Sequence, residues 1–249
     1  MRWRTLRWWL AGLGAYLLFL AATFPAGYAF SWWHKHLNGV QLTGIRGSIW
    51  SGSAQELVYK GQSWGGLVWR FDWLAPFSGH LGYRLTVQSA GESLSARVTG
   101  NRNSLLLQDI HGHAPVSLFG LWLPLPSGSL SGSLEVELSR VVLVNLNPTE
   151  AQGVVKLSGV SLNWPESVAL GDYQLKLTSQ DKNGIQGNFM DTGGPLILQG
   201  NLHLAPNGFY QISGTLASRD PNDNNLNTLI GYLPANREGR HAFRFTGNL

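Results

Sequence analysis

Two His-x-His pairs are the residues of this 249-residue sequence whose type and spacing could do chemistry: His34 with His36, and His111 with His113. Residues two apart on a β-strand share one face, so both imidazoles of a pair could reach one metal ion. The alternative is that the first pair borders a membrane and the second belongs to a turn around Gly112. Neither pair has a supporting set of acidic residues, and we predict no metal and no cofactor.

Catalytic side chains in a recognisable arrangement are missing from the sequence. Glu135 and Glu137 are two apart in an alternating segment, which favours a solvated strand face over an acid–base pair. No phosphate-binding loop, dinucleotide fingerprint, zinc-protease motif or serine nucleophile elbow is present. The chain has no cysteine, which excludes thiol catalysis, disulfides and cysteine-ligated zinc. The sequence therefore predicts a protein that is not an enzyme.

The charges indicate where the chain sits rather than what it binds. Charged residues make up 13% of the sequence, against about 25% in ordinary soluble domains. The formal charge is +4, but Arg2, Arg4 and Arg7 precede an apolar run, and the rest of the chain is almost neutral. No basic cluster follows, so we expect no nucleic-acid partner.

The segment from residue 8 to residue 33 contains no charged residue and is long enough to span a bilayer as a helix. Trp8 and Trp9 lie at one end and Trp32 and Trp33 at the other, as expected of anchors at the two membrane–water interfaces. The alternative is a cleaved signal peptide. Pro25 is expected to kink the helix or to mark its end.

The basic residues before the span predict its orientation, because such flanks stay in the cytoplasm. We therefore expect a cytoplasmic N-terminus over residues 1–7, a single transmembrane helix over 8–33 and a periplasmic β-rich domain over 34–249. The predicted location is the inner membrane of a bacterium with two membranes.

After residue 33 the hydrophobic pattern changes to a period of two, which is typical of strands with one buried face. The clearest segments are 81–87, 128–138, 154–157, 173–177, 196–204, 209–216 and 242–245. Turns are predicted at 183–184, 193–195 and 206–208, and short helices at 116–121 and 224–233. The predicted fold is mainly β: an extended, curved antiparallel sheet with one or two short helices.

Two surface features could serve contacts with other molecules. Arg219, Asp220 and Arg240 favour turns and surface ion pairs, with docking of another protein as the alternative. The aromatic segment from Trp69 to Trp73 favours core packing, with an apolar partner or lipid surface as the alternative.

Several stretches, taken in order, resemble the GspN family, protein N of the bacterial type II (general) secretion pathway. They are the N-terminal span ending near Pro25, the segment 42–54, the segment 69–74, and the C-terminal blocks 200–221 and 238–249. The second stretch carries the family-like residues Gly44, Gly47, Trp50 and Gly52.

The resemblance implies a non-enzymatic inner-membrane component of the apparatus that moves folded proteins across the outer membrane. Its partners would be the inner membrane and other type II secretion components. A second resemblance, to the envelope proteins AsmA and TamB, implies instead a protein that binds or transfers lipid along an apolar β groove.

Overall fold

The computed structural model describes residues 2–33, 39–59, 61–73, 75, 81–89, 91–100, 104–117, 130–145, 147–163, 167–179, 184–236 and 239–248. This description does not include the side chains of residues 2–7, 10, 11, 18, 21 and 33. The orienting arginines Arg2, Arg4 and Arg7 and the anchor residue Trp33 are among them. The pair His34 and His36, the positions 118–121 of one predicted helix, and positions 237–238 also lie outside the described residues.

The N-terminal segment forms two helices, where the sequence predicted one. Helix α1 spans Arg2–Ala22 and helix α2 spans Ala26–Trp33. The break falls at Pro25, which has no backbone N–H to continue the helical hydrogen-bond pattern. In the described part of the chain, neither of these helices nor α3 has both the length and the apolar character that crossing a membrane requires.

The rest of the described chain is almost entirely strand. The strands are β1 (Val40–Thr43), β2 (Arg46–Gly47), β3 (Ser51–Tyr59), β4 (Gln62–Phe71), β5 (Leu81–Ser89), β6 (Glu92–Gly100), β7 (Ser104–Pro115), β8 (Leu130–Val144), β9 (Asn147–Asn163), β10 (Ser167–Ser179), β11 (Ile185–Gly193), β12 (Leu196–Leu204), β13 (Phe209–Ser218) and β14 (His241–Asn248). One short helix, α3 (Asn224–Ile230), separates β13 from β14.

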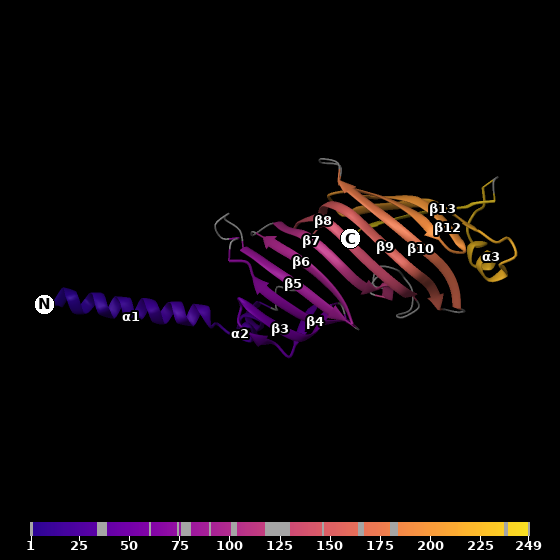
Figure 1. The fold of residues 1–249 in the computed structure, drawn as a ribbon. Coiled ribbons are helices and arrows are strands. Elements are labelled where there is room, and N and C mark those ends of the chain that lie inside the picture. Colours follow the sequence, from indigo (N-terminus) through magenta and orange to yellow (C-terminus); the bar gives the residue numbers. More distant parts are fainter. Residues whose placement is uncertain are drawn as a thin grey trace.

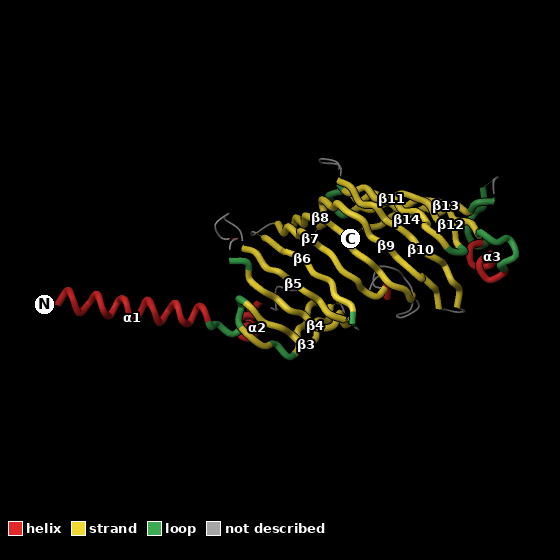
Figure 2. The backbone as a smooth tube through the Cα atoms, in the orientation of Figure 1, coloured by secondary structure: helices red, strands yellow, loops and turns green. Residues whose placement is uncertain are grey.

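All described strands belong to one antiparallel sheet whose spatial order follows the chain. From β3 to β14 every strand pairs with the next, while β1 and the short β2 both pair with β3. The sheet is long and strongly curved, with α1 extending from the end that holds β1–β5 (Figure 1). Figure 2 shows β11–β14 curving back behind β8–β10. The predicted curved antiparallel sheet is therefore confirmed.

Local signals predicted the turn at 206–208 and the helix near 224–233 correctly. The turn Pro206–Gly208 joins β12 to β13, and Ala205 N donates to Phe209 O over 2.8 Å. The predicted helix 224–233 is α3, but it ends earlier, at Ile230, before Gly231. Its first turn is capped by Asp223, whose side chain accepts a hydrogen bond from Leu226 N.

Candidate functional site

One face of the sheet carries an unbroken apolar row that crosses twelve strands. Each member of the row lies directly opposite the next across a strand pair, so all of the side chains point to the same face. The row consists of Ala54, Leu67, Val87, Leu94, Gly112, Val136, Val155, Leu175, Phe189, Gly200, Gly214 and Phe243. None of these residues is exposed.

Two glycines in the row allow aromatic rings to lie flat against the sheet. A Cβ atom at Gly200 would overlap the ring of Phe189, and one at Gly214 would press on the ring of Phe243. The two rings stack with their centroids 6.2 Å apart across the two intervening strands. The aromatic rings therefore continue the apolar face over the two positions where glycine supplies no side chain.

The adjacent row on the opposite face is mostly polar. Its members are Ser53, Val68, Thr86, Ser95, His111, Glu137, Val154, Lys176, Asn188, Asn201, Ser213 and Arg244. The sheet is thus amphipathic across its full width, and we call these surfaces the apolar face and the polar face.

Two segments cover parts of the apolar face. Helix α3 buries Leu226 (0% exposed) and Ile230 against the cluster that includes Leu196. Near the other end, the Gln62 side chain donates to Ser117 O over 3.2 Å. The chain directly after β7 therefore reaches the start of β4, although β5 and β6 lie between these strands in the sheet.

Near this apolar face the phenol of Tyr173 is buried and donates to Leu170 O over 2.7 Å. Burial raises the pKa of Tyr173, and the carboxylates of Asp191 and Asp172 raise it further. The hydroxyl therefore stays neutral and acts as a structural donor.

The family-like residues form the junction between the N-terminal helices and the sheet. Gly47 has φ +93° and pairs with Gly52 in a tight hairpin. The Trp69 ring lies over Gly52, where a Cβ atom would overlap it, and Trp69 Nε1 donates to Ser48 O over 3.0 Å. Gly44 also has positive φ, at +62°.

The same hairpin holds the start of α2. Ile49 N donates to Phe24 O over 3.0 Å, and Pro25 forms an isolated bridge with Ser48. Trp50 stacks on Trp73 with ring centroids 5.0 Å apart. These contacts join the N-terminal helices to the first strands of the sheet.

The aromatic segment after Trp69 divides between core and surface. Phe71 is buried and is the last residue of β4, whereas Trp73 lies beyond the strand and is 62% exposed. The core interpretation therefore holds for Phe71 and is wrong for Trp73, because the strand alternation stops before it.

The predicted docking residues lie on either side of α3 along the chain. Arg219 binds the Asp191 carboxylate and donates from Nε to Gly194 O over 2.8 Å. The Asp220 side chain accepts from Asn222 N over 2.9 Å. Arg240 follows α3 in the turn before β14 and is exposed. The first two residues therefore anchor the loop that positions α3, and docking stays a prediction for Arg240.

The second histidine pair lies on strand β7, so the turn expected around Gly112 is wrong. His111 contacts Ser95 Oγ over 3.0 Å and the Asp109 carbonyl over 2.8 Å. Within the described residues no group of three or more histidines, cysteines and acids could hold a metal ion. The carboxylates opposite this pair lie on the polar face as predicted, and Glu135 forms an ion pair with Lys156.

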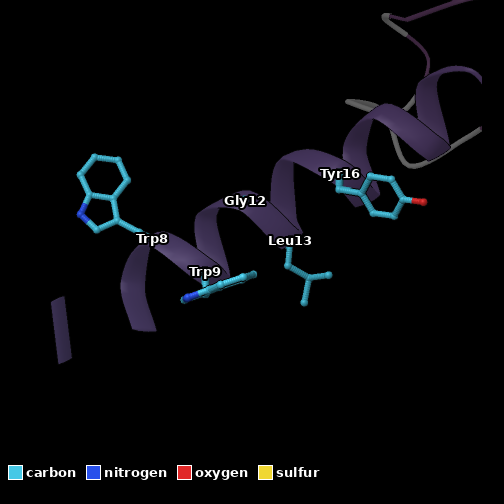
Figure 3. Close-up of a pocket in the computed structure, with 5 residues that line it drawn as sticks. All are labelled: Trp8, Trp9, Gly12, Leu13 and Tyr16. Atoms are coloured by element: carbon cyan, nitrogen blue, oxygen red, sulfur yellow. The ribbon is translucent and has the colours of Figure 1, made fainter. Parts of the chain in front are cut away.

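Helix α1 exposes aromatic side chains along its length. Trp8 is 78% exposed and Trp9 is 79% exposed. Figure 3 shows these side chains with Gly12, Leu13 and Tyr16, which together line a shallow surface hollow. A single helix lines this hollow, so we assign it no ligand, and its apolar side chains are instead suited to an apolar environment.

The polar face also carries a row of arginines that the sequence did not predict. Arg70 lies directly opposite Arg84, and Arg84 lies directly opposite Arg97. Each of the three arginines occupies a polar position in the alternation of its own strand. The sequence alone could therefore have placed each of them on the polar face. Their opposition depends on the register of β4 against β5, which the sequence does not give.

Comparison with known proteins decides the family. A family model described as type II secretion system (T2SS), protein N matches residues 38–245. The chain belongs to the type II secretion system protein N family. Protein N of Aeromonas hydrophila is 26% identical over 249 residues, covering 95% of this chain and 96% of the relative. Protein N of Vibrio cholerae serotype O1 is 26% identical over 221 residues, covering 85% of this chain and 86% of the relative.

No solved structure matches the chain. The family match begins just before β1 and ends within β14, so it covers the sheet that carries both faces and the junction. Membership makes this protein a component of a type II secretion system, and it implies contacts with other components of that system.

Proposed function

We propose that this protein is a non-enzymatic scaffold of the type II secretion apparatus, tethered to the inner membrane and assisting export of folded exoproteins across the outer membrane. The family match over residues 38–245 carries this proposal. The sheet supports it with a long, open surface on which several protein contacts can be arranged in one order.

The proposed tether is the segment 8–33, which would leave residues 1–7 in the cytoplasm and the sheet in the periplasm. Its support is a helical segment without charge whose aromatic side chains are exposed, including Trp32 at 90%. Large exposed apolar side chains in contiguous runs are characteristic of lipid or protein contact. Retention of the segment in the mature protein belongs to the same proposal.

Deletion of the gene tests the secretion role. We expect exoprotein to accumulate in the periplasm and its release to return when the wild-type gene is supplied on a plasmid. Unchanged release would refute the role.

The absence of cysteine allows a separate test of topology. A single cysteine at the exposed position Asn201 should react with a membrane-impermeant maleimide once the outer membrane is permeabilised. Reaction only after the inner membrane is broken would refute the proposed orientation. The mass of the purified protein reports whether the N-terminal segment has been removed.

A second candidate function is the binding or transfer of lipid along the apolar face. The observation that favours it is the apolar row, which runs without a polar member from β3 to β14. A photo-crosslinking amino acid at Leu85 would face this side, and one at the neighbouring Thr86 would face the polar side. Lipid adducts at position 85 and none at 86 would support the lipid function, and equal adducts or none would refute it.

A further inference from the structure

In the part of the chain that the structure describes, two arginines on the polar face oppose each other without an acidic partner. Arg70 on β4 and Arg84 on β5 are direct cross-strand neighbours, and both are exposed. In such a pair the Cβ atoms lie about 5 Å apart, and like charges at this distance destabilise the sheet. Among the described residues, neither guanidinium has an ion pair or a side-chain hydrogen bond.

The neighbouring arginines of the same row are neutralised. Arg97 Nη1 lies 3.6 Å from Asp109 Oδ2, and Arg97 Nε lies 4.0 Å from Asp72 Oδ2. Further along the row, Arg140 Nε donates to Glu150 over 3.1 Å. Within the described residues, the fold thus supplies carboxylates to one part of the row and none to the part at β4 and β5.

A third arginine extends the unneutralised part. Arg46 on β2 lies opposite Ser53 and therefore projects from the polar face, where it is exposed. Arg46, Arg70 and Arg84 form a basic patch over β2–β5, beside the junction with α2. Because charged residues are scarce in this chain, a cluster of like charges held against its own repulsion indicates an anionic partner.

We propose that this basic patch docks an acidic segment of another protein of the secretion apparatus, an inference that rests on the proposed function. The guanidinium groups of Arg70 and Arg84 are close enough to share one carboxylate, and charge-assisted hydrogen bonds of this kind are among the strongest that proteins make. Arg46 binds a second carboxylate of the same segment.

Membership of a secretion-system family favours a protein over a lipid headgroup as the partner, because it implies contacts with other components of that system. Figures 1 and 2 show β5 and β6 broadside, with β3 and β4 beside them at the end of the sheet that joins α2. The three arginines are exposed, so a neighbouring protein of the apparatus can reach them.

Removal of one of these charges should stabilise the fold but weaken binding of the acidic partner. Because the two effects have opposite signs, stability gives the first test. In the purified full chain at low salt, Arg84→Gln should raise Tm by about 1–3 °C. Added salt should raise the wild-type Tm toward that of the variant. The control is Arg244→Gln, which removes the same charge from the same face but breaks a hydrogen bond to Gln211 and should not raise Tm.

Binding is measured on the full chain with a fluorescent hexa-aspartate peptide as the probe. The double variant Arg70→Gln/Arg84→Gln should bind it about tenfold more weakly than the wild type, and the Arg244→Gln control should bind it like the wild type. Equal losses of peptide affinity in the double variant and in Arg244→Gln would overturn the proposed patch. An unchanged Tm in Arg84→Gln would overturn it as well.

A lipid arm uses the full chain in nanodiscs of phosphatidylcholine, with or without phosphatidylglycerol. If phosphatidylglycerol competes with the peptide, and does so only when both arginines are present, the partner is a membrane surface and the proposal is wrong. These readouts do not depend on secretion. Unchanged exoprotein release after gene deletion would refute the scaffold function. Equal peptide affinity in the wild type and the double variant would refute only the proposed patch.

Discussion

Adjacent valines on β9 separate the two faces of the sheet in a single experiment. Val155 belongs to the apolar row and is 7% exposed, whereas Val154 belongs to the polar row. Val155→Ala removes two methyl groups from a packed site. The lost burial is worth about 1.6 kcal/mol, and the cavity left behind brings the total to about 2–3 kcal/mol.

Urea unfolding of the full chain in mild detergent, followed by far-ultraviolet circular dichroism, measures this loss. For a domain of this size we expect the midpoint to fall by about 0.7–1 M. Val154→Ala is the matched control, with an expected loss of about 0.5 kcal/mol or less. Equal losses in the two variants would refute the assignment of the faces.

Three further predictions concern substitutions of single residues. Tyr173→Phe should lose about 1 kcal/mol at neutral pH through the hydrogen bond to Leu170 O. Because the folded pKa of Tyr173 is raised, wild-type stability falls as pH rises above about 10, and the variant should show a flatter decline. Gly47→Ala should lower the unfolding free energy by about 1 kcal/mol or more, since φ is +93° there. Arg219→Ala should release α3 from the Asp191 carboxylate, and hydrogen exchange of α3 should rise while β9 stays protected.

Each of these predictions has a contrary outcome. A decline above pH 10 that is equally steep in the phenylalanine variant would show that another group controls it. Wild-type stability for Gly47→Ala would mean that the hairpin adopts another backbone, and Gly12→Ala serves as its control because that glycine has open space. Unchanged exchange in α3 would remove the anchoring role of Arg219.

Glycines show where local sequence signals sufficed and where they did not. The turn at Pro206–Gly208 depends on neighbouring residues alone, so its residue types predicted it. Gly200 and Gly214 resemble any other strand glycine in the sequence. Their role in seating Phe189 and Phe243 appears only when three strand pairings are combined.

Long-range pairing also explains the other errors. The turn expected at Gly112 is a strand position because Gly112 pairs with residues on both β6 and β8. Trp73 was expected in the core by extending an alternation that ends at Phe71. In each case the local pattern allowed two conformations, and contacts with residues distant in the sequence selected one.

The sequence by itself determined the antiparallel strands, the polar and apolar alternation along each of them, the helix–sheet division near residue 33 and the family resemblance. These are properties of neighbouring residues, and the period of a strand is fixed by its backbone geometry. The tertiary structure alone decided the register, which aligns twelve separate alternations into one apolar face and brings Arg70 opposite Arg84. Register is a relation between strands that the sequence of either strand leaves open, because side chains repeat every second residue and each shift by two keeps the same faces.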